Sequence, residues 1–414
     1  MSFHMAAEHA IRPKEEDVIF GIAARANEAA KIYGPSNIIN STIGALLDDE
    51  GRLIAFDTVY DELKRLDNRL IANYAGLAGD PEFLKAVEKA CFMDHRPEGF
   101  IRAVATPGGT GAVRHAVYNF TDEGDTFLTA NWYWAPYGTI AEEYDRKLDT
   151  FNLFNEAGTF DFESFKEKFE AYLAKQKRLL VILNTPAHNP TGYTITDEEW
   201  DKIIALAKAH AENKENRIIF LCDIAYIDFA GQGTERRSFM EKFGNLPENI
   251  LTLFAYSASK SYTMYGLRNG AILCVSASEA IAEEFYYSCA HSNRGTWSNG
   301  TKCAMQVLAN LYNDPALYEK SEKERDVYRA LLKKRGDAFL KSAKEVELPI
   351  TNYQDGFFVS VPCKDPKALC EKLIEEKLFT VPLQNGIRLA LCAITEEKCA
   401  LAPRLIKDAL NTME

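Results

Sequence analysis

Lys260 is the first candidate for chemistry in this sequence because of the segment that precedes it. Residues 251–256 are apolar and β-prone, and they predict a buried strand that ends just before Ser-Ala-Ser-Lys. Burial at a strand end would lower the pKa of the lysine, which could then act as an amine nucleophile and form a Schiff base. Arg268, eight residues later, adds a fixed positive charge. The alternative is a solvated lysine after a strand, since most lysines are solvated.

A glycine-rich turn, Pro-Gly-Gly-Thr-Gly at 107–111, joins a predicted strand to a predicted helix. Glycines let the backbone approach an anion, and the free N–H groups of a helix N-terminus attract one. Gly109 and Thr110 are therefore candidate phosphate contacts, and a plain tight turn is the alternative. A dinucleotide-binding fingerprint is incomplete here, because Arg114 follows where a third glycine is needed.

Three more polar side chains follow predicted strands. Asn189 lies in a turn-rich segment after the strand at 179–184, whereas Asp223 and Tyr226 leave the end of the strand at 217–223. In open α/β sheets, ligands bind beyond the carboxyl ends of the strands. Each residue also has a plain interpretation, as part of a loop, a capped aspartate or a packed tyrosine. Their joint occurrence with the glycine turn and the lysine at successive strand ends favours one shared ligand site.

Apolar runs alternate with helical segments through the middle of the chain, which predicts a largely parallel sheet buried on both faces. The predicted strands lie at 101–106, 125–130, 179–184, 217–223, 251–256 and 270–275. The predicted helices lie at 14–32, 82–92, about 110–119 and from the capping box at Thr196 to about 212, and the loop over 35–51 contains a short strand at 38–39. The last third predicts a smaller α+β domain, with a charged helical stretch at 298–341, strands at 356–361 and 386–391, and a helix at about 366–377.

Composition limits the class of protein. The chain has 414 residues, 47% hydrophobic and 26% charged, so two domains of a soluble globular protein are expected. A net charge of −12 argues against a nucleic-acid-binding surface. Nine single cysteines without a Cys-x-x-Cys pair predict neither disulfides nor a metal site, and they fit a reducing cytoplasm. We expect no signal peptide and no membrane span, because no apolar run reaches about 18 residues.

At this point the sequence resembles a fold-type-I pyridoxal-phosphate enzyme, and specifically the class I aminotransferases similar to aspartate and aromatic aminotransferases. The motifs that carry the resemblance are His-Asn-Pro-Thr-Gly at 188–192, Asp-x-x-Tyr at 223–226, and Ser-x-Ser-Lys with Gly-x-Arg at 257–268. The resemblance implies a three-layer α/β large domain with a mostly parallel, mixed sheet, a smaller α+β domain built from both chain ends, and a homodimer with shared active sites. We expect an N-terminal arm with part of the small domain at 1–50, a large cofactor-binding domain at 51–300, and a small domain at 301–414.

The resemblance also implies a role for each residue that contacts the cofactor ring. Lys260 carries pyridoxal 5'-phosphate as an internal aldimine and, once displaced by substrate, acts as general base and acid. Asp223 keeps the pyridine nitrogen protonated, so that the ring can accept electrons. Tyr226 and Asn189 bind the ring oxygen. Trp134 stacks on the ring, with Trp132 close enough to be an alternative.

The phosphate and substrate contacts follow in the same way. The phosphate is bound by Gly109, Thr110, Ser257 and Arg268, and by Tyr74 from the partner subunit. Arg388 forms a fork to the substrate α-carboxylate, although an arginine on the last strand of the small domain is the plain alternative. Asn189 and Gly44 complete the substrate-binding set, Gly44 in a segment that closes over the substrate.

One departure from the resemblance concerns the substrate side chain. In members specific for dicarboxylates, a second arginine binds the side-chain carboxylate, and here its place holds Ser288 or a neighbour. Arg294 is close in sequence but in a different register. An aromatic or broader amino acid is then at least as plausible as aspartate, with His291, Tyr133 and Trp297 as possible lining residues or as ordinary core aromatics.

Three other functions compete with amino transfer to a 2-oxo acid such as 2-oxoglutarate. A β-eliminating C–S lyase would use the same cofactor, the same lysine and the same electron sink. A transcriptional sensor would need an additional DNA-binding module, and the sequence offers only about 35 residues before the first matched region. An NAD enzyme is disfavoured by the missing third glycine and by Asn131 and Trp132, which stand where an acidic residue is needed.

Overall fold

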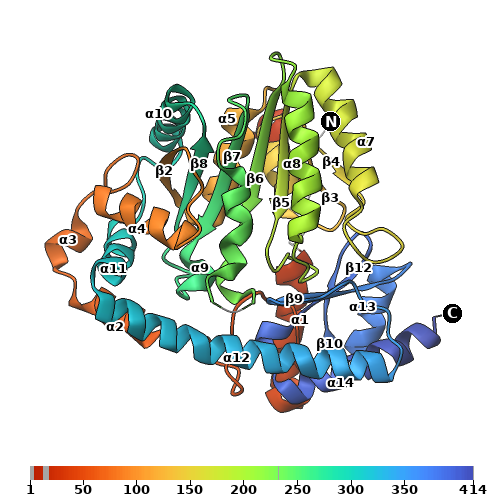
Figure 1. Cartoon of the computed structure of the whole chain (residues 1–414). Helices are drawn as coiled ribbons and strands as arrows, with labels where there is room; N and C mark the ends of the chain where they lie inside the picture. The colour runs from red at the N-terminus through yellow and green to blue at the C-terminus, as the bar shows by residue number, and fades with distance from the viewer. Residues whose placement is uncertain (1–3, 13–17, 232, 414) are drawn as a thin grey trace.

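A seven-stranded sheet forms the centre of the computed structural model, which describes residues 4–12, 18–231 and 233–413 (Figure 1). Strand β8 runs antiparallel to both of its neighbours, and the other neighbouring pairs are parallel. The predicted mostly parallel, mixed sheet is therefore confirmed. In spatial order the strands are β2 (Phe100–Pro107), β8 (Asn269–Ser276), β7 (Ile250–Ser257), β6 (Arg217–Asp223), β5 (Arg178–Asn184), β3 (Thr126–Ala130) and β4 (Lys147–Phe151).

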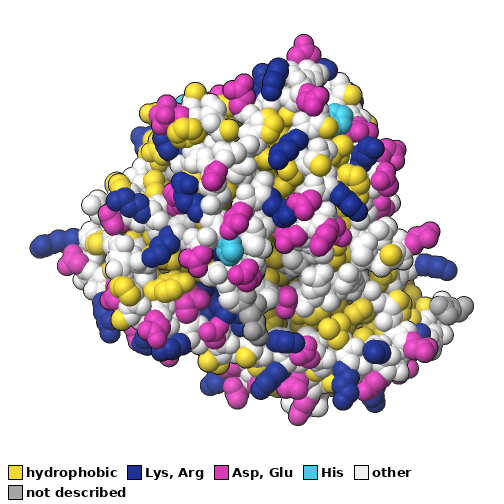
Figure 2. All heavy atoms as spheres, viewed as in Figure 1, with side chains coloured by type: hydrophobic (Ala, Val, Ile, Leu, Met, Phe, Trp, Pro, Cys, Tyr) yellow, Lys and Arg dark blue, Asp and Glu magenta, His cyan; other side chains and the backbone are white. Residues whose placement is uncertain are grey.

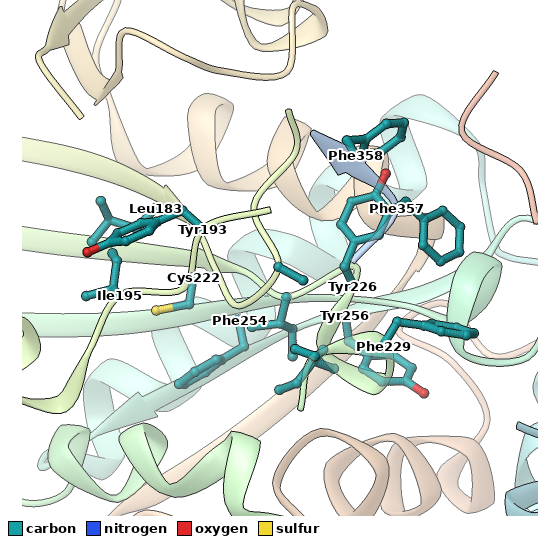
Figure 3. Packing of buried hydrophobic residues seen from close by; sticks show 14 of the residues in the cluster. Leu183, Tyr193, Ile195, Cys222, Tyr226, Phe229, Phe254, Tyr256, Phe357 and Phe358 are labelled. Atoms are coloured by element: carbon teal, nitrogen blue, oxygen red, sulfur yellow. The ribbon is translucent and has the colours of Figure 1, made fainter. Parts of the chain in front are cut away.

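Both faces of this sheet are buried, because its central strands are mostly apolar and are buried at nearly every position. Along β7, Phe254 and Tyr256 pack into one core while Leu253 and Ala255 pack into the other. The first core, part of which Figure 3 shows, is covered by α4 (Pro81–Phe92), α7 (Phe162–Gln176) and α8 (Asp197–Ala211). The second is covered by α5 (Gly108–Phe120), α6 (Pro136–Glu143) and α10 (Glu279–Thr296). Each fully buried Leu or Phe side chain contributes about 1.5–3 kcal/mol to folding.

Two smaller sheets accompany the large one, and one of them joins segments from both ends of the described chain. The three-stranded sheet contains β11 (Val381–Pro382), β12 (Gly386–Ala390) and β9 (Phe358–Pro362), all antiparallel. Beside it, β1 (Ile39–Asn40) pairs in parallel with β10 (Leu378–Phe379), so the N-terminal region joins the C-terminal part as expected. The surrounding helices are α1 (Val18–Tyr33), α13 (Pro366–Glu375) and α14 (Glu396–Asn411), and the long α12 (Pro315–Glu345) runs from beneath the large sheet to the small one (Figure 1).

The remaining elements are short connections. They are η1 (Glu8–Ala10), η2 (Pro35–Asn37), α2 (Asp57–Arg65), α3 (Asn68–Ala72), η3 (Ile227–Phe229), η4 (Glu235–Phe243), α9 (Ala258–Ser261), α11 (Lys302–Asn313) and η5 (Leu391–Ala393). The predicted stretch at 298–341 is in fact two helices, because Asp314 caps α12 and Pro315 begins it. The glycine turn is itself the first turn of α5, while the Thr196 capping box is confirmed. The first residues of the helix predicted at 14–32 lie outside the described residues.

Charged side chains of both signs are spread over the surface, with apolar side chains between them on the face that Figure 2 shows. Each of the nine cysteines is a free thiol. Among the described helices, none combines the length and the apolar character that a membrane crossing requires.

A buried charge cluster supports the loop that leaves β6. Asp228 is 1% exposed and accepts hydrogen bonds from Arg237 Nη2 at 2.8 Å and Arg236 Nη2 at 3.1 Å, while Arg325 Nη1 lies 4.0 Å away. Burial alone would raise the pKa of Asp228, but the arginines more than offset this and hold it well below its usual range. Arg325 also donates to the carbonyl oxygen of Ser261 at 2.8 Å, so the cluster ties α12 to the residues around Lys260.

We expect Asp228→Ala to lower the free energy of unfolding by about 3–5 kcal/mol, because it leaves buried guanidinium groups without their carboxylate. Urea unfolding of the two proteins measures this difference. Glu28→Ala is the control, since its ion pair with Lys31 is exposed and its loss should change stability by less than about 0.5 kcal/mol. A loss below about 1 kcal/mol for Asp228→Ala would contradict the expectation.

Candidate active site

One cavity lies at the edge of the large sheet where its parallel strands end. Strands β5, β6 and β7 are parallel neighbours, so the residues that follow them meet there. Arg268 precedes the antiparallel β8 and therefore starts from the same edge. The cavity is lined by Gly109, Thr110, Trp134, Asn184, Asn189, Asp223, Ala225, Tyr226, Ser257, Ser259, Lys260 and Arg268.

Lys260 enters this cavity from the single-turn helix α9, which follows β7 directly. Its side chain is half-buried, with Nζ 5.3 Å from the ring centroid of Tyr226 and 5.9 Å from that of Tyr265. Desolvation lowers the pKa of Lys260 to about 8, Asp223 partly opposes this, and Arg268 adds to it. An appreciable fraction of the amine is thus neutral near physiological pH, as the strand-end position predicted.

Asp223 and Tyr226 present a carboxylate and a phenol to the same cavity. Asp223 accepts a hydrogen bond from the hydroxyl of Tyr137 at 2.6 Å and a longer one from the N–H of Ala225 at 3.3 Å. Burial raises the pKa of Asp223, and these hydrogen bonds oppose the rise. Burial likewise raises the pKa of Tyr226, whose hydroxyl lies 3.4 Å from the side-chain amide of Asn189. Tyr226 is therefore a neutral donor.

The start of α5 and the guanidinium of Arg268 form a cradle of hydrogen-bond donors. Gly108 has a φ of +69°, and a Cβ added there would lie 2.6 Å from Arg268 Nη2, so a side chain would fill the space. A Cβ at Gly109 would come within 3.4 Å of Ser257 Cβ. Arg268 itself is held by the hydroxyl of Ser259 at 3.3 Å and by main-chain carbonyls. Free N–H groups, hydroxyls and a cation at a helix N-terminus are suited to a phosphate.

Arg388 lies on β12, at the junction with the small sheet, and is 4% exposed. Its Nη2 donates to the carbonyl oxygen of Thr42 at 2.7 Å, and its Nη1 approaches Oδ1 of Asn189 at 3.4 Å. The guanidinium lies 4.4 Å from the ring centroid of Phe358. Among the described residues no carboxylate pairs with Arg388, and its Nε has no hydrogen-bond partner. A buried arginine in this state is suited to a carboxylate of a bound molecule.

The other residues singled out by sequence lie in several environments. Trp134 lines the cavity, whereas Trp132 is buried against Gly386. Gly44 touches Phe358, because a Cβ there would lie 2.4 Å from the ring. Tyr74 is 82% exposed and lies outside the cavity of its own chain.

The candidates for contacts with a substrate side chain also lie outside this cavity. Tyr133 stacks on Tyr137, and Trp297 stacks on His115 at 4.8 Å. His291 is exposed, and Arg294 donates to the hydroxyl of Ser298 at 2.9 Å.

Sequence reasoning missed four residues at the site. Asn184 links the segments that carry Asn189 and Asp223. Its Oδ1 accepts a hydrogen bond from the N–H of Asn189 at 2.7 Å, and its Nδ2 donates to the carbonyl oxygen of Asp223 at 3.1 Å. Its position as the last residue of a predicted strand was an available signal. Ser259, Tyr265 and Tyr137 complete the set, and only Ser259 stood in a motif that had been recognised.

Comparisons with known proteins agree on one family. A family model described as aminotransferase class I and II matches residues 36–404. An aromatic-amino-acid aminotransferase of Paracoccus denitrificans is 28% identical over 285 residues, which cover 67% of this chain and 69% of that protein. An aspartate aminotransferase of Salmonella typhi is 26% identical over 326 residues, covering 74% and 76%. The crystal structure of an aminotransferase from Anaerococcus prevotii is 40% identical, covers 100% of both chains and superimposes with a TM-score of 0.96.

Proposed function

Because the chain belongs to the class I and II aminotransferase family, we propose that the cavity around Lys260 is the site of amino transfer. The protein is a pyridoxal 5'-phosphate-dependent enzyme that moves an amino group between an amino acid and a 2-oxo acid. One observation supports this site best. Lys260, whose pKa is about 8, lines the same cavity as the carboxylate of Asp223 and the guanidinium of Arg268. The relatives carry aminotransferase names, which leaves a β-eliminating lyase without support.

The donors and acceptors of the cavity fit pyridoxal phosphate along its whole length. When bound, the cofactor supplies a ring that accepts the electrons left when the substrate loses its Cα proton. Asp223, a buried carboxylate that accepts its shortest hydrogen bond from a neutral hydroxyl, would accept a hydrogen bond from the ring nitrogen. Tyr226 and Asn189 would donate to the ring oxygen, and Trp134 would cover the ring. Lys260 would bind the cofactor and, at Nζ, take up and return the Cα proton of the substrate.

The phosphate end of the cofactor would lie in the cradle at the start of α5. Gly109 and Thr110 offer main-chain N–H groups and a hydroxyl, Ser257 offers a second hydroxyl, and Arg268 supplies the charge. We assign Tyr74 to the site of a second subunit. Tyr74 is 82% exposed in this chain and does not line the cavity of its own subunit, and both observations support that assignment. The proposed assembly is therefore a homodimer with shared sites, and a cytoplasmic location agrees with nine free thiols.

Arg388 is the proposed contact for the α-carboxylate that amino and 2-oxo acids share. It offers donors that have no carboxylate of their own among the described residues, at a position next to Asn189 and beneath the segment that holds Gly44. The residues of the chain indicate the substrate side chain less closely than they indicate the α-carboxylate. Ser288 or a neighbour stands at the place of the second arginine of dicarboxylate-specific members, and Arg294 donates a hydrogen bond to Ser298. We therefore propose a substrate range centred on aromatic amino acids that extends to aspartate.

A panel of amino donors with 2-oxoglutarate tests this range. We expect tyrosine and phenylalanine to have a kcat/KM at least about tenfold above aspartate, because a second carboxylate would be desolvated without a matching cation. Methionine and alanine complete the panel, and glutamate formation is the readout. Preference for aspartate over both aromatic donors would contradict the proposed range. Release of pyruvate and ammonia from a β-substituted amino acid, with no transfer to 2-oxoglutarate, would contradict amino transfer itself.

A further inference from the structure

Tyr137 makes the shortest hydrogen bond to a side chain that lines the cavity. Its hydroxyl donates to Oδ2 of Asp223 at 2.6 Å, and both residues are buried, Tyr137 completely. The other hydrogen bond to this carboxylate comes from the N–H of Ala225 at 3.3 Å and reaches Oδ1. Tyr137 therefore fixes one oxygen of Asp223 and leaves the other directed to a weak partner.

Tyr137 also packs against the aromatic residue of the same cavity. Its ring meets that of Trp134 edge to face, with centroids 5.5 Å apart and planes at 87°, and its N–H donates to the carbonyl oxygen of Trp134 at 3.0 Å. Tyr137, on α6, thus contacts both Trp134, which we propose stacks on the cofactor ring, and Asp223, the proposed partner of the ring nitrogen. A tyrosine that only filled the core would need a partner for its hydroxyl, but not this particular carboxylate.

We propose that Tyr137 is a positioning residue that holds the Asp223 carboxylate in the orientation in which it meets the nitrogen of the cofactor ring. The proposal rests on the function proposed above. Tyr137 acts through Asp223 and touches neither the substrate nor the reacting atoms.

The charge states of the two groups agree with this role. Burial and the nearby carboxylate raise the pKa of Tyr137 well above its usual value, so it stays a neutral donor. Burial raises the pKa of Asp223, and the hydrogen bond from Tyr137 is the foremost contribution that opposes the rise. Without this bond Asp223 would take up a proton more readily, and an uncharged carboxyl group would no longer keep the ring nitrogen protonated.

Tyr137→Phe tests the proposal, because it removes the hydroxyl and keeps the ring that packs on Trp134. We expect kcat to fall about 10- to 100-fold, the KM for the amino donor to stay within about twofold, and the dissociation constant of pyridoxal phosphate from reconstituted apoenzyme to rise about tenfold. Tyr172→Phe is the matched control, since the hydroxyl of Tyr172 also donates to a carboxylate, that of Asp149 at 2.8 Å, but both residues lie outside the cavity. 3-Fluorotyrosine at position 137, which keeps both ring and hydroxyl, should retain kcat within about threefold.

A double-mutant cycle on cofactor affinity separates positioning from packing. If Tyr137 acts through Asp223, adding Tyr137→Phe to Asp223→Asn should change the dissociation constant of pyridoxal phosphate by less than about twofold. Equal losses in the two backgrounds, wild-type behaviour of Tyr137→Phe, or an equal loss in Tyr172→Phe would overturn the proposal. Failure of the wild-type protein to bind pyridoxal phosphate or to transfer amino groups would instead refute the function on which the proposal rests.

Discussion

Lys260→Ala is expected to lower amino transfer by at least about 10⁴-fold, the largest effect of any single substitution in this chain. The substitution removes the amine that we propose both to bind the cofactor and to move the Cα proton. The visible absorbance of the added cofactor should also lose its dependence on pH, because the titrating nitrogen is gone. A stopped assay of glutamate formation and a spectral titration of the reconstituted protein measure the two effects.

The control for this substitution is Lys398→Ala. Lys398 is another lysine whose pKa is lowered by burial, but its Nζ donates to the carbonyl oxygen of Ile38 at 2.7 Å and lies outside the cavity. Its loss should leave the spectral titration unchanged. Persistence of the pH-dependent absorbance in Lys260→Ala would show that another group binds the cofactor, and the central assignment would then be wrong.

The sequence allowed six of the seven strands of the large sheet and most of its site to be predicted, because both follow from local pattern, whereas the edge strand β4 was missed. Strands β5, β6 and β7 are continuous apolar runs, so their ends could be located within one or two residues. Parallel neighbours then end at one edge, which places Asn189, Asp223 and Lys260 together. This prediction required only the positions of the strand ends and no knowledge of side-chain packing.

The parts that could not be predicted depend on packing between distant segments. Tyr137 lies 86 positions from Asp223, and α6, which carries it, was not recognised in the sequence. Asp228 contacts arginines from η4 and from α12, and no local pattern in the sequence indicates that these charges meet. The direction of a strand within the sheet also cannot be predicted from composition. Arg268 lies at the cavity because β8 runs antiparallel to β7.

Arg388→Lys should raise the KM for amino donors and 2-oxo acids alike by about 10- to 100-fold, since lysine keeps the charge but cannot form a two-pronged contact with a carboxylate. We expect so large an effect because Arg388 is buried and has an unsatisfied donor within the described protein. It is 4% exposed, its Nε is without a hydrogen-bond partner, and its neighbours are a carbonyl, an amide oxygen and the face of Phe358. The cost of burying this charge is recovered only when a carboxylate binds.

Steady-state kinetics on a matched pair of variants distinguish this role from a structural one. Arg404→Lys changes an exposed arginine, paired with Glu345 at 3.1 Å, and should leave both KM values unchanged. In Arg388→Lys the affinity for pyridoxal phosphate should stay within about threefold of wild type, because the proposed contact of Arg388 is the α-carboxylate and not the cofactor. A loss of cofactor affinity with an unchanged KM would place Arg388 in the support of the fold. A shared rise in KM for every substrate, whatever its side chain, follows only if Arg388 binds the one group that all of them have in common.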